Sequence, residues 1–276
     1  PMDWFVIALT SFLTFISPVN LIGDRLIADQ IRSRVYQVED LSVRVDNAPS
    51  FQAVQGKIER VRIASRGIEI VPELRIEQLQ LETDPIDVRW QSLSGANLPK
   101  LRQSLRQPLQ GAVQVVITET DINRALADSQ IKARLETLLN RVIPADAPRF
   151  QIDSIQVDFL ESETTDTAQA PRLNLLLNLR QGLNSEKEPA ALAIAIETGV
   201  QIDNGDRLML IDPVVMLDGR KISSRVVNSI TSSFINQLSL KRLEKQGITA
   251  RILRYDLTDD QAAFSLFVGI QPSTNP

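Results

Sequence analysis

The sequence predicts an α+β fold in which a long, curved antiparallel sheet wraps around one or two amphipathic helices. About ten segments alternate apolar with polar residues, the pattern of strands that have one buried face and one exposed face. Between two of them, the segment DNGD at 203–206 contains the Asn-Gly pair that two-residue hairpin turns favour. Few segments show helical periodicity, so helices are expected to contribute less than strands.

Residues 1–34 are predicted to form a hydrophobic helix that contacts a membrane. Residues 4–23 contain no charged side chain, and about 20 residues of helix span roughly 30 Å, the thickness of a bilayer core. Polar residues within the segment leave three alternatives open, namely a transmembrane helix, an interfacial helix and a core helix. The residues expected to anchor the chain are Trp4, Phe5, Ile7, Leu9, Phe12, Leu13, Phe15 and Ile16.

The charges that flank this segment favour a body on the cytoplasmic side over one in the periplasm. Asp3 precedes the segment, whereas Arg25, Arg32 and Arg34 follow it. If the segment spans a membrane, the positively charged flank stays on the cytoplasmic side. The body, residues 35–276, is expected to be a single domain because none of its polar loops is long enough to require a boundary.

The predicted strands follow one another through most of the body. Within residues 75–85 the apolar alternation changes parity between Ile76 and Leu79, which predicts a β-bulge at Glu77 and Gln78 that bends the sheet. The predicted strands cover residues 41–45, 58–63, 67–71, the stretch 75–85, 112–117, 154–159, 173–180, 192–202, 207–211, 248–253 and 263–270.

Two amphipathic helices are predicted in the body, with a shorter third one within residues 97–107. The first starts at Thr118 or Thr120 as the capping residue and ends before Pro144. Its apolar residues recur at helical spacing and are Ile122, Leu126, Ile131, Leu135, Leu138 and Val142. The second starts near Arg220, and its apolar residues fall at every fourth position, namely Ile222, Val226, Ile230, Phe234 and Leu238.

The composition argues against several classes of function. A net charge of −4, with two Trp and two Tyr, is not typical of a nucleic-acid-binding protein. The chain has no Cys and no His, which removes thiol nucleophiles and Cys or His metal sites. Ser129 and Lys132 form a weak S-x-x-K match, and carboxylates acting on lipid-linked sugars are an alternative. We therefore predict no catalytic residue, metal or cofactor, and no enzyme.

One cluster of cations is a candidate for binding lipid phosphates. The candidate headgroup-binding residues fall in and beside one predicted strand and are Lys57, Arg60, Arg62 and Arg66. The alternative is a solvated outer face whose charges are balanced by Glu59, Glu69 and Glu77.

Residues 38–86 closely resemble the start of the LmeA-like phospholipid-binding proteins, in particular the form found in cyanobacteria. The matching features are the V-D-N-A-P turn, Gly56 before an Ile-x-x-Val-x-Ile strand, the Arg-Gly turn at 66–67 and a Leu-x-Leu strand. The segments 16–34 and 115–126 are similar too. The resemblance implies a TULIP-like tubular fold with a cavity for lipid, and phospholipid binding at a plasma or thylakoid membrane.

The residues themselves favour a compatible function, because a bent sheet with one apolar face and few helices leaves apolar surface that acyl chains could cover. The expected partners are phospholipids and a membrane, with the chain binding or transferring lipid. The alternative is a membrane-tethered scaffold for a membrane protein complex, with a closed core and no ligand. The candidate tail-binding residues are Val61, Ile63, Ile68, Ile70, Ile76, Leu79, Leu81, Ile222, Val226, Ile230 and Phe234.

Overall fold

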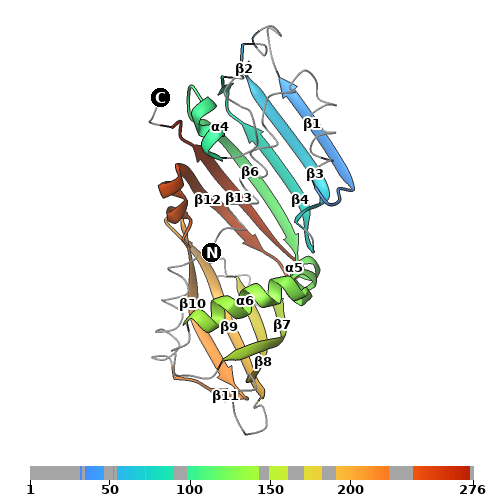
Figure 1. Cartoon of the computed structure of the whole chain (residues 1–276). Coiled ribbons are helices and arrows are strands. Elements are labelled where there is room, and N and C mark those ends of the chain that lie inside the picture. Colours follow the sequence, from blue (N-terminus) through green and yellow to red (C-terminus); the bar gives the residue numbers. More distant parts are fainter. Residues whose placement is uncertain are drawn as a thin grey trace.

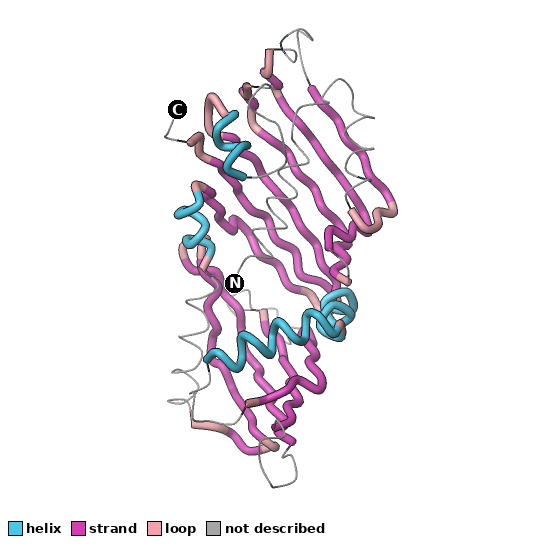
Figure 2. Tube along the Cα trace, viewed as in Figure 1, coloured by secondary structure: helices cyan, strands magenta, loops and turns pink. Residues whose placement is uncertain are grey.

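The computed structural model places most of the residues that it describes in two antiparallel sheets, in agreement with the predicted α+β class. Figure 2 shows that strands predominate over helices among the described residues. The residues that the structure describes are 32, 35–46, 52, 55–71, 73–89, 98–142, 149–160, 171–181, 191–223 and 239–273.

The larger sheet has six strands in the order β1-β3-β4-β6-β13-β12. Every neighbouring pair is antiparallel, so residues of one parity line up across the sheet. The strands are β1 (Asp40–Asp46), β3 (Arg60–Val71), β4 (Leu74–Thr83), β6 (Leu109–Thr118), β12 (Ile248–Leu257) and β13 (Gln261–Ile270). Helix α4 (Leu98–Ser104), the 3₁₀ helix η3 (Leu240–Gln246) and the short pair β2 (Lys57–Ile58) and β5 (Ile86–Asp87) supply further core residues.

The smaller sheet has five strands in the order β11-β10-β9-β8-β7. Its strands are β7 (Phe150–Leu160), β8 (Arg172–Gln181), β9 (Ala191–Asp203), β10 (Arg207–Leu217) and β11 (Arg220–Lys221). The β9–β10 turn is the predicted Asn-Gly hairpin, since Asn204 and Gly205 both have positive φ. This turn links the sheets, because Ile252 N–H of β12 donates to the Gly205 carbonyl at 2.6 Å.

Two helices connect the sheets where a single helix was predicted. Thr118 caps α5 (Glu119–Ala127), as expected, and its side chain accepts a hydrogen bond from Asp121 N–H. The chain leaves helical geometry at Asp128, whose carboxylate accepts from Gln130 N–H and Ile131 N–H and so starts α6 (Ser129–Val142). Helix α5 lies where the two sheets meet, and α6 continues from it beside β7 (Figure 1).

The predicted bulge at Glu77 and Gln78 is wrong. The register between β3 and β4 is continuous there, with Gln78 opposite Arg66 and Ile76 opposite Ile68. On both strands the buried side chains switch between odd-numbered and even-numbered residues, and they do so at paired positions. The switch therefore requires no inserted residue on either strand. On β3 this change occurs at Gly67, which has a φ of +58°, and the actual register shift lies between Glu69 and Val71.

Three predicted boundaries also differ from the structure. The predicted strands 58–63 and 67–71 are largely one strand, β3, because Gly67 allows the chain to continue without a turn. Strand β10 extends beyond 211 through an irregularity between Ile211 and Val214. The second predicted helix does not include Arg220, which lies in β11 and pairs with Leu217 of β10. The rest of that predicted helix, 224–238, lies outside the described residues.

Gly67 provides a test of this kinked strand. A Cβ at Gly67 would clash with Cδ of Glu39, and the positive φ adds backbone strain. We expect Gly67→Ala to lower the free energy of unfolding by about 1–3 kcal/mol. Gly219→Ala is the matched control, because Gly219 has a φ of +74° but no atom within 4 Å of the added Cβ. Urea denaturation of both variants checks this, and an equal loss in both would show that contact with Glu39 does not matter.

Candidate lipid-binding site

The inner face of the five-stranded sheet is apolar but incompletely buried. Its strands are in register, so apolar residues of β7, β8, β9 and β10 form continuous rows on one face. All residues of two rows are half-buried. One row is Val157, Leu175, Ile196 and Val215, and the next is Ile155, Leu177, Ile194 and Leu217.

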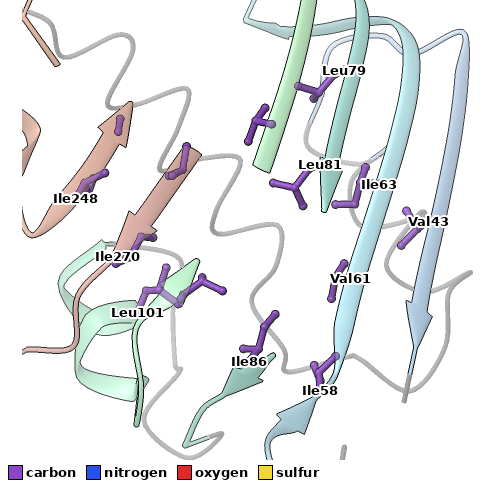
Figure 3. Close-up of a cluster of buried hydrophobic side chains, with 14 of the residues drawn as sticks. Val43, Ile58, Val61, Ile63, Leu79, Leu81, Ile86, Leu101, Ile248 and Ile270 are labelled. Atoms are coloured by element: carbon purple, nitrogen blue, oxygen red, sulfur yellow. The ribbon is translucent and has the colours of Figure 1, made fainter. Parts of the chain in front are cut away.

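The six-stranded sheet differs because its apolar face is filled by the protein's own side chains. Most of the candidate tail-binding residues on β3 and β4 belong to this core, and Val61, for example, is 1% exposed. Figure 3 shows some of them in the same cluster of buried side chains as Leu101 of α4 and Ile270 of β13. The buried candidates are Val61, Ile63, Ile68, Ile76, Leu79 and Leu81.

The remaining candidate tail-binding residues are spread over the molecule. Ile70 is partly buried and packs against the same core, and Ile222 is half-buried just after β11. Val226, Ile230 and Phe234 lie outside the described residues. The structure therefore does not bring the predicted set together at one surface, and its role in lipid binding stays a prediction.

One row of the six-stranded sheet is less buried at β6, β13 and β12 than at β4. This cross-strand row runs from Leu79, which is 3% exposed, through Val115 and Phe264 to Tyr255. The last three are half-buried, and the Tyr255 and Phe264 rings lie 5.0 Å apart between centroids. Burial, with a smaller contribution from Asp256, raises the pKa of Tyr255 to about 12. This aromatic pair gives a second half-buried apolar surface.

Helices α5 and α6 are attached to β7, the edge strand of the five-stranded sheet, by side-chain hydrogen bonds. Asn123 donates to the Val157 carbonyl at 2.7 Å and accepts from Val157 N–H at 2.8 Å. Asn140 makes the same two bonds with Phe150, at 2.7 and 3.0 Å. In addition, Glu119 accepts from Phe159 N–H at 2.6 Å, and Glu136 accepts from Ile152 N–H at 2.7 Å. We call these four side chains the edge ladder.

The edge ladder has a signal in the sequence that helical periodicity alone does not reveal. The pattern E-T-x-x-N-R occurs at 119–124 and again at 136–141. In each copy, Glu and Asn are four residues apart and therefore lie on the same face of a helix. Each copy bonds to the backbone N–H groups of two β7 residues that are two positions apart. Every second residue of an edge strand directs its N–H group away from the sheet, so the Glu and Asn of each motif match this spacing.

Arg75 connects β4 to the start of α5 through a cluster of carboxylates. Its guanidinium lies 2.8 Å from Glu39, 2.6 Å from Glu77 and 2.9 Å from Asp121. Asp121 is 2% exposed and also pairs with Arg124 at 2.8 Å. The hydrogen bond with Glu39, followed by that with Glu77, raises the pKa of Arg75, so the cation is fixed at this junction. A carboxylate in the first turn of a helix suggests only an interaction with the helix dipole, so the sequence does not reveal this pairing.

The candidate headgroup-binding arginines on β3 are paired within the protein. Arg60 lies 3.1 Å from Glu82, and Arg62 donates to Asp46, on the face opposite the core. Lys57 and Arg66 are exposed. The hydrogen bond from Arg62, and then that from Arg44, holds the pKa of Asp46 below its ordinary value. Two of the four candidates would therefore have to exchange an internal carboxylate for a phosphate, and their role stays a prediction.

Metal sites and membrane-spanning helices are both absent from the residues that the structure describes. No group of three or more acidic side chains there is arranged to hold a metal ion. No helix in the same residues is long and apolar enough to cross a membrane. The predicted anchor, residues 4–23, lies outside this part of the chain.

A comparison with protein families supports lipid as the ligand. The model of the LmeA-like phospholipid-binding proteins matches residues 18–266. The chain belongs to this family. Comparisons with curated proteins and with solved structures gave no match. Membership of the LmeA-like family supports phospholipid binding, and the antiparallel α+β architecture is consistent with the TULIP-like fold that the resemblance implied.

The edge ladder predicts the effect of changing Asn123. In Asn123→Ala, Val157 loses partners for both its N–H and its carbonyl, and we expect a loss of about 1–3 kcal/mol in unfolding free energy. Asn178→Ala is the control, because among the described residues the exposed Asn178 side chain donates only to the Ser154 hydroxyl, at 2.8 Å. Amide hydrogen exchange should be faster at Val157 in Asn123→Ala alone. Unchanged exchange at Val157 would contradict the role of the ladder.

The Asp46–Arg62 pair predicts an acid dependence of stability. Since the pKa of Asp46 is lowered in the folded state, the pair stabilises the protein above the ordinary Asp pKa, and this contribution is lost as pH falls through the lower value. Asp46→Asn should therefore destabilise at neutral pH and lose stability less steeply on acidification. Urea midpoints from about pH 7 to about pH 3 measure this slope. Asp256→Asn, with its 3.5 Å contact to Arg254, should keep the wild-type slope.

Proposed function

We propose that the chain holds the acyl chains of a phospholipid against the half-buried inner face of the five-stranded sheet and transfers the lipid between membranes. The observation that carries this proposal is the pair of rows on β7 to β10, all of whose residues are half-buried and apolar. The six-stranded sheet, whose face is filled by the core, supplies the stable frame.

The position of α6 supports the proposal. The helix is attached to β7 through polar side chains, so its apolar residues are not needed to hold it in place. Ile131, Leu135 and Leu139 remain half-buried on the same helix. Apolar side chains of a helix and of a sheet that each retain exposed area form a surface suited to a flexible hydrocarbon chain.

Burial of acyl chains at such a site provides enough free energy to bind a phospholipid. Each methylene that leaves water contributes about 0.8 kcal/mol, so partial burial of two acyl chains supplies several kcal/mol. No catalytic group is required for this function, in keeping with a sequence that has neither Cys nor His. Association with a membrane follows from the ligand, and the hydrophobic segment 4–23 is the proposed anchor.

Adjacent leucines on β8 give a direct test. Leu175 lies on the inner face, whereas Leu176 lies on the opposite face, and both are half-buried. We expect Leu175→Asn to weaken phospholipid binding about 10- to 100-fold, because a leucine contact with the tail is lost. Leu176→Asn should bind as the wild type does. Native mass spectrometry of the purified full chain, followed by lipid extraction, measures the bound lipid.

Two outcomes would contradict the proposal. Wild-type protein without stoichiometric lipid would favour a scaffold with a closed core. Equal loss of lipid in Leu175→Asn and Leu176→Asn would show that the changes act on the fold of β8 and not on a tail-binding face. Circular dichroism and urea midpoints of both variants identify any general loss of structure.

A further inference from the structure

The acidic and the basic side chains of helices α5 and α6 are placed differently. Residues 119–142 contain four carboxylates, and every one is directed at a backbone N–H group or at an arginine of the protein. Glu119 and Glu136 accept from β7, Asp128 accepts at the start of α6, and Asp121 pairs with Arg75. The four carboxylates of the helix pair therefore all have partners within the protein.

The cations of α6 are placed differently. Lys132 is half-buried and Arg134 is exposed. Within the described part of the chain, neither of them makes a salt bridge, although Glu136 lies one helical turn after Lys132. The described surface of α6 therefore offers positive charge that its own carboxylates do not neutralise.

These cations border the apolar residues of α6. At 100° per residue, Ile131, Leu135 and Leu139 form one stripe, with Lys132 next to it on one side and Arg134 on the other. Long cationic side chains lay their methylene stems along apolar surface and extend the charged end toward its edge. A phospholipid whose tails lie against the stripe would bring its phosphate to the borders of the stripe, where these two cations lie.

We propose that Lys132 and Arg134 form a headgroup site that selects phospholipids with a net negative headgroup. The inference rests on the proposed function, since the tails are taken to lie on the adjacent apolar surface. Ammonium and guanidinium groups form charge-assisted hydrogen bonds with phosphate oxygens. The β3 arginines are less suited to this role, because Arg60 and Arg62 already pair with Glu82 and Asp46.

The test compares two double variants that remove the same charge. Lys132→Gln/Arg134→Gln removes the proposed site, and Lys241→Gln/Lys245→Gln removes two exposed cations of η3. Full-length proteins are exchanged into equal amounts of phosphatidylglycerol and phosphatidylcholine with identical acyl chains. Native mass spectrometry then gives the ratio of the two lipids that remain bound.

The wild type is expected to prefer phosphatidylglycerol. A cation near an anionic lipid surface favours binding about fivefold, so the α6 double variant should lose about 30-fold of this preference. The α6 double variant should bind phosphatidylcholine within about twofold of the wild type, because the acyl tails provide the affinity for this lipid. The control double variant should keep the wild-type ratio, and excess inorganic phosphate should leave the bound lipid in place.

Other results would overturn the inference. An unchanged ratio in Lys132→Gln/Arg134→Gln, or the same loss in both double variants, would show that the α6 cations do not select the headgroup. Displacement of lipid by inorganic phosphate would indicate a phosphate site that is independent of lipid. A wild type that carries both lipids equally refutes only this inference, whereas a wild type without lipid refutes the proposed function itself.

Discussion

The unpaired edge of β7 is the constraint on which the arrangement of the smaller sheet depends. An edge strand presents N–H and C=O groups that need partners, and in many proteins another strand provides them. Here two helices provide them through Asn123 and Asn140, each of which copies the donor and acceptor of a neighbouring strand. Because the helices are held by polar groups at the edge, they do not have to fill the apolar face of the sheet.

The two sheets use the same alternation of apolar and polar residues for different purposes. In the larger sheet, side chains from α4, η3 and the β2–β5 pair complete a core, with Ile58 and Leu243 each 2% exposed. In the smaller sheet, the core cluster takes no member from the described residues of β7 to β11. Stability therefore resides mainly in one sheet, which leaves apolar area on the other for a ligand.

The sequence was sufficient for the strands and for the Asn-Gly turn, because alternation and turn preferences act over a few residues. It was insufficient for the site, because Val61 and Leu175 stand in similar alternating runs although one is in the core and the other is half-buried. That difference depends on which distant segments cover each face. The parity change at Gly67 was missed for a related reason, since it depends on the pairing of β3 with β4. The break at Asp128 is instead a local cap, which helical periodicity does not reveal.

The edge ladder also explains how a helix pair with balanced charge can present a positive surface. Residues 119–142 contain four acidic and four basic residues, so their sum gives no electrostatic signal. The ladder directs Glu119 and Glu136 toward β7, and Arg75 holds Asp121 at the junction. Lys132 and Arg134 are left without a carboxylate partner among the described residues, and Arg134 lies exposed. The contacts that satisfy the strand edge thus determine where an anionic headgroup is stabilised.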